Sequence, residues 1–338
     1  MKKTGYLLFA FGISLLIAIL LYFGIGDIFK ALEAAGFGLI LVAASHIAPL
    51  FLDSIAWQLL FIGPKVPRLP LLIKARWIGE SINSLLPAAQ IGGDLIRARM
   101  LAVRGYPVAE AGASVLVEIT VALMTQLIFS LVGIGGLIYL GNHNLVKQAI
   151  IAVAALCLGA AGFFAVQKKG MWTKLLDIMS IVFSKEKLEG LAPDAKALDE
   201  AISKLYSQKN VIFKSSIWRL VGWFSGATEV WLALKFLGAD TGIFEAVLLE
   251  SLGQIIRGVA FLVPGAFGIQ EGGFVLLGSL MGLTPEIALG MSLSKRFREL
   301  VLGIPGLIVW QIEEGKLAFG RKNAKKNAAK DGKGVDKS

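Results

Sequence analysis

The stretch Leu85–Arg99, LLPAAQIGGDLIRAR, interrupts the apolar runs of this chain with a proline and a Gly-Gly pair, followed at once by an acid and two arginines. A second stretch, Leu262–Phe274 (LVPGAFGIQEGGF), has a proline, a glutamine, a Gly-Gly pair and an acid beside that pair. Unpaired backbone amides cost several kcal/mol in hydrocarbon, so such breaks occur in lipid only where protein or a water-filled cavity covers them. Two broken apolar segments at matching places in the two halves of a membrane protein indicate a central binding site.

The composition places most of the chain in lipid. Of its 338 residues, 56% are hydrophobic and 17% are charged, and the mean hydropathy is +0.71. Soluble domains carry about 25% charged residues. The single cysteine, Cys157, lies in an apolar run, which excludes a disulfide framework and a cysteine metal cluster. Because His46 and His143 also lack a metal-binding spacing, we expect no metal and no other cofactor.

The net charge of +10 gathers at the C-terminal end. From Lys316 onward, eight lysines and arginines accompany only two aspartates. A basic tail can bind nucleic acid, but on an integral membrane protein a cytoplasmic tail near anionic lipid is the favoured interpretation. We therefore expect residues 316–338 to form a disordered basic cytoplasmic tail, and we expect no nucleic-acid partner.

The apolar runs predict an all-α polytopic membrane protein. The first run, Tyr6–Phe23, is longer than the apolar part of a signal peptide and has no persuasive cleavage site after it, so we expect it to be a span. Gly170–Asn210 is polar and amphipathic, which predicts a small helical cytoplasmic insertion in a membrane domain that covers residues 1–315. The other expected spans are Phe37–Ile62, Val108–Leu140, Leu145–Val166, Val211–Leu237 and Pro285–Gln311.

Each break is expected to form a re-entrant hairpin, the first over Leu71–Gly105 and the second over Phe244–Gly282. Basic residues precede the first span and gather again between Lys65 and Arg76, which the positive-inside rule places in the cytoplasm. The resulting fold has six full spans and two broken-helix hairpins that enter from opposite faces, with both termini cytoplasmic. A fold with eight full spans keeps the same termini.

Matched spacings support an inverted repeat of the two halves. Glu80 and Arg257 each lie seven residues before the proline of their break. Glu118 and Arg296 each lie eleven residues after the proline that opens the following span. Both equivalent pairs exchange an acid for a base. If Glu118 or Glu80 pairs with an arginine across the symmetry axis, neutralising one partner would leave the other without a counter-charge.

The breaks and the charges inside the spans supply a candidate lipid-headgroup site. A helix that begins after a Gly-Gly pair has free N–H groups and a positive dipole end, which suit a phosphate. A charge at the bilayer centre costs at least ~2.5–3.5 kcal/mol on insertion scales, so these residues should pair or line a polar cavity. The candidate residues are Glu80, Gln90, Gly92, Gly93, Asp94, Arg97, Glu118, Arg257, Pro264, Gln270, Glu271, Gly272, Gly273 and Arg296.

Several charged residues also have a purely structural interpretation. Asp94 suits a helix N-cap, and Glu271 suits a capping role as well as a functional one. Arg97 and its neighbour Arg99 can grip a phosphate bidentately, or they can form a basic cytoplasmic edge near anionic lipid. In the later spans, we expect Arg219 at the interface and Glu229 deeper in the bilayer. Arg298 and Glu299 also suit a position near the interface.

The two motifs LLPAAQIGGDLIRARMLAVRG and VPGAFGIQEGGFVLLG, each with the span that follows, resemble the lysylphosphatidylglycerol-synthase transmembrane-region family, also called flippase-like. Within that family, the chain is most similar to the hopanoid-biosynthesis-associated branch. The resemblance covers about residues 5–312 and implies a multi-pass protein of the bacterial cell inner membrane that moves or presents a lipid. Because a lysine-rich tail stands where the bifunctional synthases have an aminoacyl-transferase domain, we do not expect synthase activity.

Three classes of function are compatible with these features. The first is a flippase or transporter of an amphipathic membrane lipid, either a hopanoid or a phospholipid. The second is a membrane partner without transport activity that docks a lipid-biosynthesis enzyme through the insertion and the tail. The third, an intramembrane enzyme, requires a nucleophile–base pair or a metal constellation, and the sequence has no recognisable one, so we do not expect an enzyme. An oligomer is compatible with each class.

Overall fold

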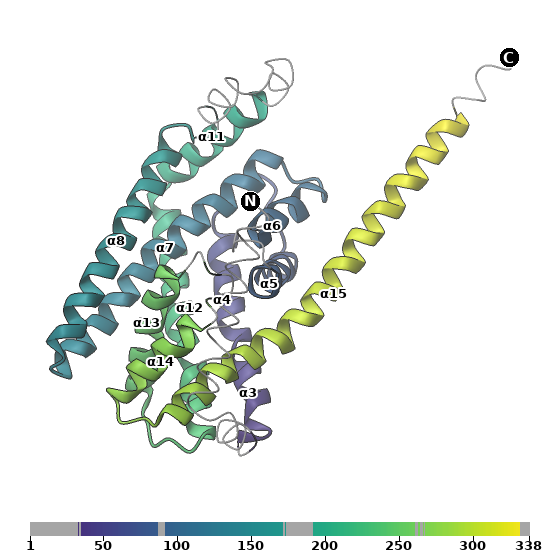
Figure 1. The fold of residues 1–338 in the computed structure, drawn as a ribbon. Coiled ribbons are helices and arrows are strands. Elements are labelled where there is room, and N and C mark those ends of the chain that lie inside the picture. The colour runs from purple at the N-terminus through teal and green to yellow at the C-terminus, as the bar shows by residue number, and fades with distance from the viewer. Residues whose placement is uncertain are drawn as a thin grey trace, which may run out of the picture.

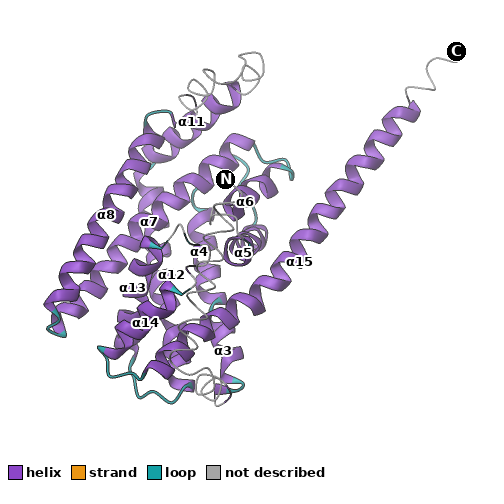
Figure 2. Ribbon diagram, in the orientation of Figure 1, coloured by secondary structure: helices purple, strands orange, loops and turns teal. Residues whose placement is uncertain are grey.

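A computed structural model describes the backbone of residues 33, 35–86, 92–171, 173, 192–260, 263, 266 and 268–331. All regular structure in these residues is helical, and the helices pack into one bundle from which the end of the last helix projects (Figures 1 and 2). The predicted all-α class is therefore confirmed for the described residues. The first predicted span, Tyr6–Phe23, lies outside them.

The first half of the chain follows the predicted order of elements. The predicted span Phe37–Ile62 consists of two consecutive helices that meet at His46. Pro107 stands directly before the long helix that follows the first break, where its missing N–H leaves no helical hydrogen bond unmade. The helices are α3 (Gly38–Ser45), α4 (Ile47–Gln58), α5 (Leu69–Leu85), α6 (Gly92–Ala102), α7 (Val108–Tyr139) and α8 (His143–Lys168).

The second half begins with the predicted insertion, of which the structure describes one helix. This helix, α11, packs on α7 and α8 and contributes Ile202 and Leu205 to a buried cluster that also contains Trp57. The insertion is thus joined to the bundle through an apolar face. The helices are α11 (Ala192–Ser207), α12 (Lys209–Phe236), α13 (Ile243–Val259), α14 (Ile269–Ser279) and α15 (Pro285–Asp331).

The packing of the two halves is exchange-symmetric. Within the first half, α4 packs on α5, α5 on α6 and α6 on α7; within the second, α12 packs on α13, α13 on α14 and α14 on α15. Between the halves, α4 contacts α12, and the contact of α5 with α15 is matched by that of α13 with α7. A pseudo-two-fold axis that exchanges the halves would produce this pattern. The side of the membrane from which each hairpin enters stays a prediction.

Three helical segments of the described residues are long and apolar enough to cross a membrane: Gly38–Gln58, Val108–Tyr139 and His143–Lys168. The predicted spans in α12 and α15 are long helices too, but they carry buried charged residues such as Glu229 and Arg298. These buried side chains face protein instead of lipid, so they lower the apolar character of both helices without exposing their own charge to hydrocarbon.

The last helix is longer than the sequence predicts. Disorder was expected from Lys316, but α15 continues as a helix to Asp331. Alanine and lysine recur in this segment, and both favour helix intrinsically. Figure 1 shows this end of α15 leaving the bundle. Residues 332–338 lie outside the described part of the chain.

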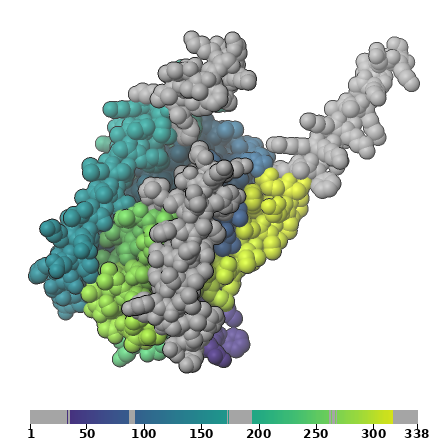
Figure 3. Space-filling model, in the orientation of Figure 1, coloured from purple at the N-terminus to yellow at the C-terminus, as the bar shows by residue number. Residues whose placement is uncertain are grey.

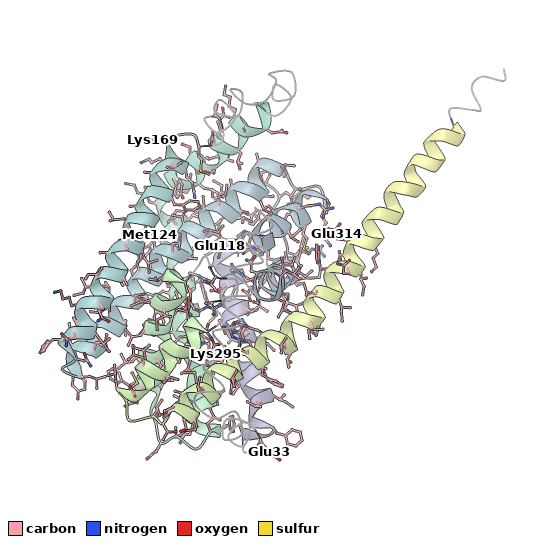
Figure 4. All side chains as sticks on the ribbon, in the orientation of Figure 1. Glu33, Glu118, Met124, Lys169, Lys295 and Glu314 are labelled. Atoms are coloured by element: carbon pink, nitrogen blue, oxygen red, sulfur yellow. The ribbon has the colours of Figure 1, made fainter. Side chains whose placement is uncertain are left out.

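Two hydrophobic clusters hold the bundle together. One centres on α4, α5 and α7 and contains Trp57, and the other joins α12, α13 and α14 and contains Phe274. Buried charged side chains lie on the same helices. Figure 4 labels two of them, Glu118 on α7 and Lys295 on α15, toward the middle of the bundle.

Candidate functional site

A cavity of about 840 Å³ lies where the helices of the two halves meet. Residues of α4, α5, α6, α7, α8, α12, α13 and α15 line it. Inside a membrane protein, charges at this density have to be paired or hydrated. The charged lining residues are Arg76, Arg97, Arg219, Arg257, Lys295, Arg298, Asp53, Glu80, Asp94, Glu118, Glu229, Glu250 and Glu299.

Glu118 on α7 is the centre of the first-half charges. Its Oε1 accepts a hydrogen bond from Arg76 Nη2 at 2.6 Å, and its Oε2 accepts one from Arg97 Nη2 at 2.8 Å. Arg97 also pairs with Asp94 at 2.8 Å, and its guanidinium lies 4.8 Å from the ring centre of Trp57. Glu118 does not pair with an arginine across the symmetry axis, because both of its ion-pair partners belong to its own half.

The first Gly-Gly pair brings α6 onto α5. A Cβ atom at Gly93 would lie 2.0 Å from the Gly79 carbonyl oxygen, so only glycine permits this approach. The Gly93 N–H donates to Asn83 Oδ1 at 2.8 Å. This amide is therefore already used by the protein, and the role that the structure supports for Gly93 is helix packing. Gln90 lies outside the described residues.

Arg296 on α15 is the centre of the second-half charges. Its Nε donates to Glu271 Oε1 and its Nη1 to Glu299 Oε2, each at 2.9 Å. Glu271 is fully buried and also caps α14, since its Oε2 accepts from the Gly268 N–H at 2.6 Å. Glu271 is therefore both a helix cap and an ion-pair partner of Arg296. Arg257 lies 3.8 Å from Glu299 and is the more exposed partner.

Within the cavity lining, the ion-pair links between the halves come from His46 and from Asp53 of α4, which the candidate set of residues omitted. His46 Nδ1 lies 3.3 Å from Glu229 Oε2, and His46 Nε2 lies 3.4 Å from Glu80 Oε2. Seven residues further along, Asp53 pairs with Arg219 of α12. Glu80 therefore meets a histidine instead of an arginine of the other half.

Of the three residues expected near the interface, Arg298 and Glu299 are buried in the bundle and Arg219 is partly buried. Arg219, Arg298 and Glu299 all line the cavity, and Arg298 Nε donates to Glu229 Oε1 at 3.1 Å. Glu229 is buried as expected. Charge inside a predicted span is the sequence signal that identifies all four, because each such charge needs a partner or water.

One connected chain of ion pairs and hydrogen bonds joins the two breaks. Its longest steps are those of Arg76 with Glu80 at 3.7 Å and of Arg298 with Glu299 at 3.8 Å. In order along the chain, the members are Asp94, Arg97, Glu118, Arg76, Glu80, His46, Glu229, Arg298, Glu299, Arg296 and Glu271.

The cavity gathers only part of the predicted site. Glu80, Asp94, Arg97, Glu118 and Arg257 line it. The other described candidates, including Gln270 and Arg296, are not among the lining residues. Gln270 Nε2 instead donates a hydrogen bond to Ser292 Oγ at 3.5 Å. For Gly273 the reason is packing, since a Cβ atom there would lie 2.5 Å from Ile256 Cδ1. Pro264 lies outside the described residues.

A separate charged cluster ties α15 to the first hairpin outside the cavity. Glu313 accepts a hydrogen bond from Lys74 at 2.9 Å and another from Arg104, and Glu314 pairs with Arg99. The hydrogen bond from Lys74 holds the pKa of Glu313 below its usual value. Arg99 thus has a partner within the protein.

The cavity also has an apolar side, built from α7, α8 and α13. Its lining there includes Leu123, Leu127, Leu156 and Val259. Helix α8 forms one edge of the bundle, seen at the left of Figures 1 and 3, and exposes large apolar side chains such as Leu158.

Among the described residues, no group of three or more His, Cys, Asp or Glu side chains is placed to hold a metal ion.

Comparison with known proteins identifies a family. Residues 7–306 match the family described as the lysylphosphatidylglycerol synthase TM region. A UPF0104 membrane protein of Pyrococcus horikoshii is 22% identical over 326 residues, which cover 91% of this chain and 95% of the relative. A UPF0104 membrane protein of Methanothermobacter thermautotrophicus is 23% identical over 321 residues, covering 88% and 91%. No solved structure has significant similarity to the chain.

Proposed function

We propose that this chain, which belongs to the lysylphosphatidylglycerol synthase TM-region family, moves an amphipathic lipid across the membrane in which it is embedded. The observation that carries the proposal is the central cavity, whose lining combines many charged side chains with apolar side chains of α7 and α8. A lipid needs both environments at once while its headgroup crosses. We expect the membrane to be the bacterial inner membrane, with both termini cytoplasmic.

The charged side of the cavity suits a headgroup. Buried polar atoms without a hydrogen-bond partner include the Nε atoms of Arg76, Arg97 and Arg219 and the Oδ1 atom of Asp53. All four residues line the cavity. Because an unpaired buried polar group is costly, water or a polar guest is the expected partner for these residues. Arginine is well suited to a phosphate, which it binds with two parallel hydrogen bonds.

The apolar side suits a lipid chain. Gly159 lines the cavity on α8, and a Cβ atom added there would meet nothing within 4 Å. Leu156, one turn earlier, contacts the position of Gly258 on α13. At this contact between α8 and α13, an acyl chain or a hopanoid ring system would stay in apolar surroundings while the headgroup enters the charged part of the cavity. The identity of the lipid, hopanoid or phospholipid, stays open within this proposal.

Two competing functions receive less support. A docking partner for a lipid-biosynthesis enzyme would use the insertion, but the described apolar residues Ile202 and Leu205 of α11 are buried against the chain's own bundle. An intramembrane enzyme would use a reactive centre, whereas the charges on the cavity lining are arranged as paired acids and bases. The proposal therefore treats the chain as a transporter and not as an enzyme.

Lipid scrambling in vesicles tests the proposal. The protein is reconstituted in phosphatidylcholine vesicles that contain fluorescent phosphatidylglycerol, and outer-leaflet fluorescence is quenched with dithionite. Arg257 is the residue to neutralise, because it lines the cavity, makes only a 3.8 Å ion pair and keeps 30% of its side chain exposed. We expect Arg257→Gln to fold normally and to slow scrambling.

Lys147→Gln is the matched control, since it removes one exposed positive charge far from the cavity lining. It should scramble at the wild-type rate. Wild-type protein that folds but scrambles neither this lipid nor a fluorescent hopanoid would overturn the proposal.

A further inference from the structure

His46 contacts charged side chains of both halves of the chain. It lies between α3 and α4 and is reached from three other helices. Its Nδ1 lies 3.3 Å from Glu229 Oε2 of α12, whereas its Nε2 lies 3.4 Å from Glu80 Oε2 of α5 and 3.5 Å from Arg298 Nη1 of α15. One ring nitrogen therefore faces both an acceptor and a donor.

The other charged groups around His46 are already committed to ion pairs. Arg76 on α5 binds Glu118 of α7, and Glu299 on α15 binds Arg296. On α4, Asp53 pairs with Arg219 of α12. On α15, Lys295 pairs with Glu250 of α13. Histidine is the side chain that changes charge near neutral pH, so His46 is the group in this network suited to exchange a proton.

The neutral imidazole bonds only to the second half. With its proton on Nδ1, the ring donates to Glu229, and the Nε2 lone pair accepts from Arg298. The other neutral tautomer would place the Nδ1 lone pair against the Glu229 carboxylate, which is two acceptors face to face. Neutral His46 thus links α4 to α12 and α15 and leaves the Glu80 carboxylate without a donor from this ring.

The protonated imidazole has a different set of partners. Both ring nitrogens are then donors, so Nε2–H donates to Glu80 while Nδ1–H still donates to Glu229. Arg298 can no longer donate to Nε2, and it now faces a like charge at 3.5 Å. Protonation therefore replaces the contact with α15 by a contact with α5, which belongs to the other half.

We propose that His46 is a proton-binding site that couples proton movement to the movement of the lipid. This inference rests on the proposed transport function and adds its energy source. His46 lines the cavity, so cavity water can deliver and remove the proton. The proton binds the Nε2 lone pair when the cavity is open to one side and returns to water when it is open to the other. No further reactant is required.

The first test imposes a pH gradient on vesicles that contain fluorescent phosphatidylglycerol in phosphatidylcholine. If one proton accompanies each lipid, a gradient of about one pH unit sustains an about tenfold asymmetry of the labelled lipid between leaflets. His46→Gln keeps a donor and an acceptor but cannot take up the proton, so this asymmetry should vanish.

His143→Gln is the matched control, because the chain contains two histidines and His143 is exposed at the start of α8. It should retain the asymmetry. Wild-type protein that scrambles the lipid but builds no asymmetry under the gradient would overturn the coupling and leave the transport function standing.

The second test does not depend on lipid movement. In His143→Gln protein labelled with 15N-histidine, the remaining ring signal reports the protonation of His46 directly. We expect it to change with pH, as a ring that takes up and releases a proton does, within the range in which the protein stays folded. A ring that keeps one protonation state over this range would overturn the inference whatever the vesicles do. Titration together with absent lipid movement would instead overturn the transport function and support the proton site.

Discussion

A Cβ atom at Gly93 would lie 2.0 Å from the carbonyl oxygen of Gly79, so α6 and α5 are in backbone contact at the first break. This contact places Arg97 of α6 beside Glu118 of α7, with Arg76 of α5 on the other carboxylate oxygen. The Gly-Gly pair thus acts on the cavity indirectly, by setting the distance at which the charged helices meet.

Gly93→Ala should destabilise the protein. The added methyl group has to displace backbone, and overpacking of this kind costs roughly 1–3 kcal/mol or more. Gly135→Ala is the matched control, because a Cβ atom there meets nothing within 4 Å and alanine favours helix by up to about 1 kcal/mol. Thermal unfolding in detergent measures both. Equal melting temperatures for Gly93→Ala and wild type would contradict the backbone contact.

Glu118→Gln should be among the most destabilising single substitutions in the cavity lining. It leaves Arg76 and Arg97 buried without their shared carboxylate, and removing one partner of a buried ion pair costs about 3–5 kcal/mol. The exposed Glu200→Gln should change stability by less than about 0.5 kcal/mol. If Glu118→Gln melts with the wild type, cavity water solvates the two arginines and the pair is not structural.

The contact of α15 with the first hairpin should weaken in acid. The pKa of Glu313 is lower in the folded protein than its reference value of 4.5, so its contribution to stability is complete above that value and is lost as the pH falls through the lower folded value. The side chain is partly buried, with 21% of it exposed, and water screens its ion pairs at the edge of the bundle, so the effect is small. The difference in melting temperature between wild type and Glu313→Gln should be present at neutral pH and should shrink as the pH falls below 4.5. A difference that persists in acid would contradict this account.

Removing Arg321–Ser338 should leave the melting temperature unchanged. The described part of this segment is the end of α15 that projects from the bundle (Figure 1). A deletion variant that melts several degrees below the full chain would show that this segment packs on the bundle.

The orientation in the membrane can be read by single-cysteine labelling. Cys157 is exposed and has to be replaced first, for example by serine. A cysteine in place of Lys65 should react with an impermeant maleimide only from the cytoplasm, and one in place of Asp240 only from outside. Labelling of the Asp240 position from the cytoplasm would rule out the inverted arrangement of the two halves.

Local sequence patterns predicted most of the helices. The span predicted at Val108–Leu140 is α7 (Val108–Tyr139), and the return predicted at Leu145–Val166 lies within α8 (His143–Lys168). Apolar runs, prolines and glycines act through the backbone of neighbouring residues, so they can be read along the chain. The high lysine content after Lys316 predicts disorder, whereas the alanines and lysines there favour the helix that the structure contains.

The pairing of charges could not be predicted in this way. Matched spacing left open a pairing of Glu118 with an arginine of the other half, but its partners are Arg76 and Arg97. In the cavity, the ion pairs between the halves are made by His46 and Asp53. Which charges meet depends on the rotation and separation of packed helices, and the close contact at Gly93 helps to set both.

The sequence by itself determined that the chain is an all-helical membrane protein with two broken segments and charges that need partners, because composition and local backbone preferences are properties of the chain. Only the tertiary structure decided that these charges form one connected chain around a cavity with an apolar side. Coulomb attraction and hydrogen bonds depend on distances in space, and residues as far apart in sequence as His46, Glu229 and Arg298 reach those distances only when the helices pack.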